Sequence, residues 1–171
     1  MKPLKAPANT IKTDRRGGQD RSYGLLPQIL GYHLRRTQVA IFQHFSRTVA
    51  AKENITPGLF GMLQVIAANS GLGQSRLAEM MEVDRSTIVK VVDQLEGRNL
   101  IMRESSPVDK RSHCLRVTER GHAALRRMEA LVLRHEDEFA KPLSADERRV
   151  LVRLLKQLYS KPRADALRVA E

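Results

Sequence analysis

The sequence has 171 residues, a length that suits one domain able to bury a hydrophobic core. Hydrophobic residues make up 42% of the chain but aromatic residues only 4%, with no Trp, which favours a helical core of Leu, Val, Ile and Met. The single cysteine, Cys114, excludes an internal disulfide framework and a zinc site built from several cysteines. A formal net charge of +11 indicates a polyanionic partner.

The N-terminus is polar and basic, and no apolar run approaches the roughly 20 residues that a membrane span requires. We therefore expect a cytoplasmic, nucleoid-associated protein without a membrane partner. Residues 1–24 lack hydrophobic periodicity and predict a flexible basic arm, which serves either as a solubilising tail or as a contact to phosphates. Residues 161–171 are expected to form a C-terminal tail.

The helical part of the pattern begins with residues 25–51, where apolar residues recur at the spacings of one helix face. Thr56 and Pro57 mark the cap and first turn of the next helix. A short helix over 74–82 and a second helix that starts at the cap Asp84 are separated by a tight turn. Two helices joined so closely predict a helix-turn-helix.

In the second helix of this motif, the core stripe leaves Arg85, Ser86, Val89, Lys90 and Asp93 on the opposite face. Arg and Lys donate hydrogen bonds to guanine, Ser can pair with several bases, and Val contacts the thymine methyl group. The pattern is typical of a recognition helix, although an ordinary solvated helix face has the same composition.

After Asn99 the hydrophobic period shifts toward two and predicts a hairpin, with Leu115 and Val117 on one face and Cys114 on the other. Its tip carries Asp109, Lys110 and Arg111. A guanidinium suits the narrow, electronegative minor groove, and Asp109 can orient Arg111 by pairing with it.

Two further amphipathic helices follow the hairpin, one capped by Thr118 and one preceded by the capping box Ser144 to Glu147. Their apolar stripes can bury against their own subunit or against a second copy. Between them, the consecutive carboxylates Glu136, Asp137 and Glu138 predict a solvated face.

Residues 74–121 resemble the winged helix-turn-helix core of the MarR family of bacterial transcriptional regulators. The wing pattern D-x-R, three residues, L-x-[LV]-T-x-x-G is met by Asp109, Arg111, Leu115, Val117, Thr118 and Gly121. The resemblance covers roughly residues 25–160. Two positions depart from the family pattern, since many relatives have Gly in place of Asn99 and Glu82.

The resemblance implies a mainly α fold with a small β-hairpin wing. It places the winged helix-turn-helix at about 56–117 and dimerisation helices at about 25–51 and 118–160. It further implies a homodimer on pseudopalindromic operator DNA, with recognition helices in major grooves roughly 34–36 Å apart and wings in minor grooves. The residues expected to contact DNA are Arg85, Ser86, Thr87, Val89, Lys90, Asp109, Lys110 and Arg111.

The family also implies a small-molecule effector, often an aromatic acid or its derivative. The residues that fit such a ligand are Tyr32, His33, Arg35, Arg36 and Phe60. The paired arginines suit a carboxylate or the phosphates of an aryl-CoA thioester, although the residues alone favour a solvated basic face or a contact to the DNA backbone. Some relatives sense peroxides through a cysteine in the N-terminal helices, whereas Cys114 lies in a wing strand and is read as an ordinary strand residue.

No catalytic, metal or cofactor site is expected, because the five histidines form no H-E-x-x-H spacing and no Gly-rich loop follows a strand. The leading hypothesis is a repressor of transcription, in a pathway of aromatic compound catabolism, that an anionic aromatic ligand releases from DNA. The alternatives are an architectural DNA-binding protein without an effector and a repressor that senses redox state through its cysteine.

Overall fold

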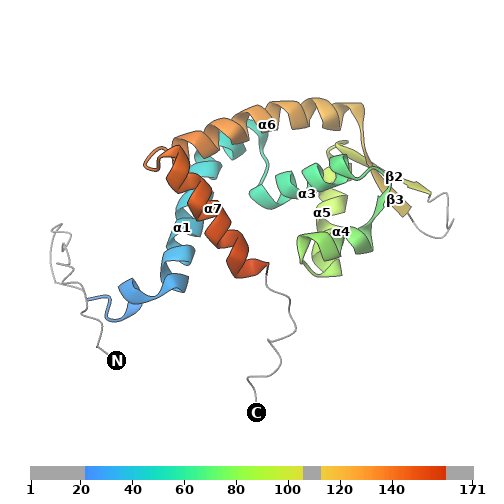
Figure 1. Ribbon diagram of the computed structural model, residues 1–171. Coiled ribbons are helices and arrows are strands. Elements are labelled where there is room, and N and C mark those ends of the chain that lie inside the picture. The colour runs from blue at the N-terminus through green and yellow to red at the C-terminus, as the bar shows by residue number, and fades with distance from the viewer. Residues whose placement is uncertain (1–21, 106–112, 161–171) are drawn as a thin grey trace, which may run out of the picture. The chain divides into compact units, whose positions relative to one another are not determined.

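The computed structural model describes residues 22–105 and 113–160 (Figure 1). The chain forms two compact units, Met1–Gln38 and Val39–Glu171, with the boundary inside α1 (Leu30–Phe45). The described part of the first unit contains η1 (Leu26–Gln28) and the first half of α1. Its side chains are exposed, apart from the half-buried Tyr32.

The helix predicted over 25–51 is not one regular α-helix. Ile29 has an extended backbone, so α1 starts only at Leu30. A π-helical turn, η2 (Ser46–Ala50), then separates α1 from the short α2 (Ala51–Glu53). The hydrophobic period indicated the helix but carried no signal for either irregularity.

The second unit holds the helix-turn-helix, a small sheet and two C-terminal helices. Its remaining elements are α3 (Pro57–Ala68), β1 (Leu72–Gly73), α4 (Gln74–Met81), α5 (Arg85–Gly97), β2 (Ile101–Ser105), β3 (His113–Val117), α6 (Glu119–Phe139) and α7 (Ala145–Tyr159). Among residues 22–105 and 113–160, no helix combines the length and apolar character needed to cross a lipid bilayer. The architecture is the predicted winged helix-turn-helix with a mainly helical frame.

The sheet has three antiparallel strands in the order β1-β3-β2, so the predicted hairpin gains a third strand. Leu72 of β1 pairs with Leu115, and Ile101 of β2 pairs with Val117. Because β3 is the central strand, Cys114 and Leu115 are both buried, with exposed fractions of 5% and 0%. Cys114 and Leu115 are successive residues of β3 and therefore lie on opposite faces, as predicted, but the structure buries both faces at this point.

The hydrophobic core joins the helix-turn-helix to the sheet and to α6. Its completely inaccessible side chains come from η2, α3, α4, α5 and β3: Val49, Leu63, Ile66, Leu77, Val92, Leu95 and Leu115. Gly121 in the first turn of α6 lies so close to the sheet that a Cβ there would stand 1.9 Å from the Leu100 carbonyl oxygen. The glycine of the wing pattern is therefore required by packing.

Local signals placed the helix starts correctly. Each predicted cap side chain accepts a hydrogen bond from the backbone N–H three residues further on: Thr56, Asp84, Thr118 and Ser144. Asn99 and Glu82 both adopt the left-handed conformation, with φ of 55° and 52°, which is the conformation that glycine adopts most readily.

Candidate functional site

Helix α5 presents one polar face to solvent because its other face is committed to the core. Ile88, Val92 and Leu95 are buried, with exposed fractions of at most 1%. On the opposite side Lys90 is exposed and Val89 retains 46% of its surface. The exposed face therefore has the shape and residue types that the sequence predicted for a recognition helix.

The first turn of α5 is organised around the carboxylate of Asp84. The Ser86 hydroxyl donates to Asp84 Oδ1 at 2.6 Å, and the Thr87 hydroxyl donates to Oδ2 at 2.8 Å. The Thr87 backbone N–H also donates to Oδ1 at 2.8 Å. These bonds, led by that of Ser86, hold the pKa of Asp84 far below its usual range. Both hydroxyls can therefore only accept hydrogen bonds from a ligand while the cap is intact.

Arg85 connects the two helices of the motif. Its Nη2 donates to Ser75 Oγ of α4 at 3.0 Å, while the side chain remains exposed. A guanidinium has five N–H donors, so this bond leaves others for a partner. Three of the predicted contacts, Arg85, Ser86 and Thr87, are thus pre-positioned by contacts within the motif itself.

A contact that the sequence did not indicate joins the wing to the recognition helix. Arg103 of β2 donates through Nη2 to Asp93 Oδ1 at 2.5 Å and through Nη1 to the Glu96 carboxylate. Its backbone N–H also donates to Glu96 Oε1 at 3.3 Å. The only sequence signal was the pair of carboxylates three residues apart on α5, which does not identify a partner. The three predicted contacts at the wing tip, Asp109, Lys110 and Arg111, lie outside the described residues.

The candidate effector residues of the first unit all lie on α1, where Tyr32 contacts both Arg36 and His33. Arg36 Nη1 donates to the Tyr32 hydroxyl at 3.2 Å, and its guanidinium carbon lies 5.6 Å from the centre of the Tyr32 ring. Arg35 donates to Gln38 Oε1 at 3.1 Å, and His33 Nε2 donates to the Pro27 carbonyl at 2.8 Å. Both arginines are exposed. Phe60 belongs to the second unit, where it packs half-buried against the core.

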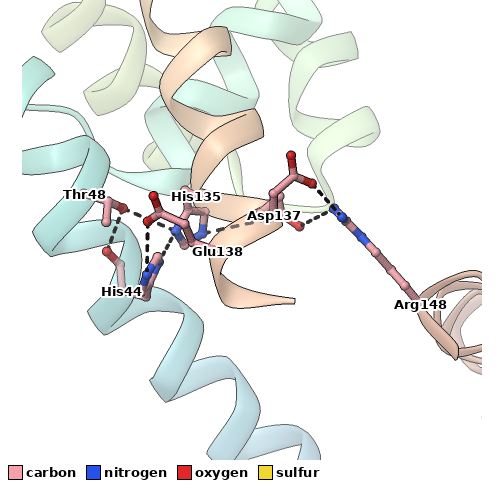
Figure 2. A network of polar contacts seen from close by, with 7 residues as sticks. His44, Thr48, His135, Asp137, Glu138 and Arg148 are labelled. Carbon is pink, nitrogen blue, oxygen red and sulfur yellow. Dashed lines mark hydrogen bonds and ion pairs between the residues drawn. The ribbon is translucent and has the colours of Figure 1, made fainter. Parts of the chain in front are cut away.

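A histidine pair joins the C-terminal end of α1 to α6 (Figure 2). The two Nδ1 atoms of His44 and His135 are 2.6 Å apart, and Thr48 Oγ1 lies 3.3 Å from His135 Nδ1. Because the Thr48 hydroxyl donates its proton to the His44 carbonyl at 2.8 Å, it can only accept from His135. His135 Nδ1 therefore carries the proton, and His44 Nδ1 accepts.

Among the residues that the structure describes, His135 is the one buried polar residue, with 2% of its surface exposed. Burial lowers its pKa below the ordinary value, and the nearby His44 lowers it further, while Glu136 and Glu138 act in the opposite direction. The lowered pKa favours the neutral form of the His135 imidazole in the folded protein. Among residues 22–105 and 113–160, no cluster of three or more His, Cys, Asp or Glu side chains is arranged to hold a metal ion.

The three consecutive carboxylates of α6 are largely exposed, as their sequence predicts, with side-chain exposed fractions of 41%, 77% and 53% for Glu136, Asp137 and Glu138, but each also contacts a side chain of another helix. Arg148 of α7 donates to Asp137 at 2.9 Å and lies 3.7 Å from Glu136, as Figure 2 shows in part. Glu138 lies 3.8 Å from His44 Nε2. The carboxylates thus connect α6 to α7 and to the histidine pair.

The chain is similar to several characterised regulators. Residues 55–113 match the model of the MarR family. A Thauera aromatica protein assigned as a transcriptional regulator of the hcr operon is 53% identical over 137 residues, which cover 80% of this chain and 82% of that protein.

Among solved structures, the transcriptional repressor CouR bound to a 23-mer DNA duplex is 37% identical, with a TM-score of 0.78 over 82% of this chain and 99% of that chain. CouR bound to p-coumaroyl-CoA is 35% identical, with a TM-score of 0.77 over 84% of this chain and 100% of that chain. The PcaV regulator from Streptomyces coelicolor, solved with its natural ligand, is 31% identical, with a TM-score of 0.71 over 84% of this chain and 96% of that chain. With its capped recognition helix and wing, the chain belongs to the MarR family of transcriptional regulators.

Proposed function

We propose that the protein is a repressor that binds pseudopalindromic operator DNA as a homodimer and is released by an anionic aromatic ligand, as the free acid or the aryl-CoA thioester. The observation that carries the DNA-binding part is the exposed face of α5, where Arg85, Val89 and Lys90 stand opposite a fully buried stripe. Support comes from the likeness to CouR, whose matched chain was solved on a DNA duplex. Sequence-specific DNA recognition requires hydrogen-bonding and apolar side chains of this kind in contact with the edges of the bases.

The dimer is supported by α7, none of whose residues is buried. Its large apolar side chains retain about half of their surface in the single chain: Val150, Leu151, Val152, Leu154 and Leu158. Exposed apolar stripes of this length are typical of surfaces that another protein covers. A second copy bound through this helix places two recognition helices on one duplex.

The effector class is supported by the Tyr32 and Arg36 pair and its neighbour Arg35, which offer an aromatic surface and two exposed guanidinium groups. Aromatic rings pack against aromatic rings, and guanidinium groups bind carboxylates or phosphates through paired hydrogen bonds. Two similar structures support the same class, since CouR was solved with p-coumaroyl-CoA and PcaV with its natural ligand. A coupling of about 1–3 kcal/mol between ligand and DNA is typical.

Selection of bound fragments from sheared genomic DNA, at about 0.15 M salt, tests the DNA-binding proposal first. The regulator recovers a recurring palindrome with half-sites about one helical turn apart. Diffuse recovery with a steep salt dependence supports the architectural alternative instead, because phosphate contacts dominate such binding.

A Lys90→Met variant tests the assigned face of α5. We expect it to weaken binding to the selected operator about tenfold, because a lost base contact costs about 1–3 kcal/mol. Lys52→Met is the matched control, since it removes the same charge from an exposed position on α2. Equal loss in both variants shows that only net charge matters and contradicts the assignment of α5.

Release by ligand is measured by titrating the operator complex with aromatic acids, their CoA thioesters, and coenzyme A alone. The double variant Arg35→Ala, Arg36→Ala is expected to weaken ligand affinity at least tenfold, by removing charge-assisted bonds. Arg126→Ala, Arg134→Ala removes two charges from exposed positions on α6 and serves as the control. Full ligand affinity in the first variant eliminates this cluster as the anion site.

A further inference from the structure

Arg98, the C-cap residue of α5, holds two backbone carbonyls that are distant in sequence. Its Nη1 donates to the Asn54 carbonyl oxygen and its Nη2 to the Glu53 carbonyl oxygen, both at 2.9 Å. These carbonyls belong to the last residue of α2 and to its C-cap. Carbonyls at a helix C-terminus lack intrahelical partners and carry the negative end of the helix dipole, so a guanidinium satisfies both their hydrogen bonding and their charge.

The same segment is held from the other side by α6. Arg127 donates through Nε to Glu53 Oε1 at 3.0 Å and through Nη2 to Oε2 at 3.2 Å. The Glu53 side chain is only 16% exposed, and its hydrogen bond raises the pKa of Arg127. Glu53 therefore accepts from Arg98 with its backbone and from Arg127 with its carboxylate, and it links the end of α5 to α6.

The chain at this link is itself well fixed. Ile55, two residues after Glu53, is 2% exposed and belongs to the core. The Asn54 N–H donates to the Ala50 carbonyl at 2.8 Å, and Thr56 caps α3. Because this segment is held in place by the core and by its own hydrogen bonds, the bonds that Arg98 makes to it fix the position of the C-terminal end of α5.

Helix α5 otherwise packs through its apolar stripe against α4, α3 and β2. Apolar packing favours burial without a preferred direction, whereas a forked guanidinium on two adjacent carbonyls fixes both distance and angle. Arg98 is thus a directional contact at the C-terminal end of α5, and Arg103 binds the same helix from the wing.

We propose that Arg98 is a positioning residue that sets the direction of the recognition helix relative to α6, and through it the half-site spacing that the dimer accepts. This inference rests on the proposed binding of operator DNA by a homodimer. Helix α5 has 13 residues and is about 20 Å long, with the proposed base contacts near its N-terminal end and Arg98 at its C-terminal end. Arg98 therefore acts without touching a base. At that length a tilt of about 10° moves the N-terminal end by about 3.5 Å, which is close to the rise of one base pair.

The test uses the palindrome selected by the unchanged protein, together with duplexes whose central spacer is one base pair shorter or longer. We expect the unchanged protein to prefer the natural spacing by at least about tenfold, because half-site spacing follows dimer geometry. Arg98→Met and Arg127→Met each remove one step of the link and are expected to reduce this preference to less than about threefold. Arg126→Met, which removes a charge from the adjacent exposed position on α6, keeps it.

Spacing preference separates positioning from stability. A variant that is merely less stable binds all three duplexes more weakly by the same factor, and that result in Arg98→Met overturns the proposal. If Arg98→Met does not fold, Arg98→Lys carries the test, since it keeps the charge but loses the fork and should show an intermediate preference. A spacing preference that is unchanged in folded Arg98→Lys and in Arg127→Met also overturns the proposal.

Failure of the unchanged protein to select any palindrome is a separate result, because it contradicts the proposed function before any variant is made.

Discussion

Helices α3 and α7 are both rich in apolar residues, yet those residues have opposite surroundings. In α3, Leu59, Met62, Leu63 and Ile66 are all buried, with exposed fractions of at most 4%. In α7 no residue is buried, and the side chains of its apolar stripe keep 43–55% of their surface. The difference is visible in their sequences: α3 has no charged residue and is apolar on nearly all sides, whereas α7 carries one apolar stripe opposite a charged face. A helix that is apolar all round is buried within its own chain, and the exposed stripe of α7 is left for a partner.

The largest effect is expected inside the buried core to which α3 belongs, at Gly121, where α6 meets the sheet. In a Gly121→Ala variant the new Cβ would lie 1.9 Å from the Leu100 carbonyl oxygen and 2.7 Å from Val117 Cγ1, so the backbone must shift. We expect a loss of about 3 kcal/mol or more in the free energy of unfolding, measured by urea titration. Gly97→Ala is the control, because a Cβ there meets nothing within 4 Å and removing a helical glycine favours folding. Similar urea midpoints for the two variants would contradict the close packing of α6 on the sheet.

A second, smaller effect comes from truncating one leucine in each helix. Leu63→Ala is expected to cost about 2–5 kcal/mol of unfolding free energy, because Leu63 is completely inaccessible in the single chain. Leu154→Ser on α7 is expected to keep the helical circular dichroism spectrum while the sedimentation coefficient shifts toward that of a monomer. If Leu154→Ser remains a dimer at micromolar concentration, the α7 stripe is not the surface that holds the two copies together.

The smallest expected effect is on the pH dependence of stability and comes from His135, the buried histidine of α6. Because the pKa of His135 is lowered by burial from an ordinary value of 6.5, the unfolded chain binds a proton that the folded protein does not as pH falls below about 6.5. Stability attributable to His135 is therefore present at neutral pH and is lost progressively below pH 6.5. The groups around it are His44 on α1, Thr48 on η2, and Glu136 and Glu138 on α6.

Urea midpoints measured between pH 7.5 and pH 5 test this expectation. His135→Gln should flatten the fall in stability over that range, since its amide does not titrate. His122→Gln, an exposed position on the same helix, should leave the fall unchanged. A fall of equal size in all three proteins would assign the pH dependence to other groups.

The features that the sequence predicted correctly have local signals. A cap residue and the N–H it accepts from are three residues apart, so Thr56, Asp84 and Ser144 identified their helices without knowledge of the fold. The exposed face of α5 followed from a single helical period. The wing pattern is also a short motif, and it includes the tightly packed Gly121. This motif allowed the prediction to cover the whole winged domain.

The features that were missed depend on contacts between distant residues. Arg98 binds carbonyls 44 and 45 residues away, and the histidine pair spans 91 residues. Strand β1 has only two residues, too few for any alternation to appear. Positive residues such as Arg98 are read from sequence as a solvated surface, because nothing in their own neighbourhood specifies a partner.

The π turn at Ser46–Ala50 affects how this chain can be aligned with its relatives. A π turn closes its hydrogen bond over one residue more than an α turn, which changes the direction of the following side chains by about 100°. A relative with a uniform α-helix here would need a one-residue gap inside a helix, where alignments normally place none. Without that gap, Arg35 and Arg36 would be matched to positions that face a different way. Residue numbers for ligand contacts should therefore be transferred by superposing the two helix segments separately.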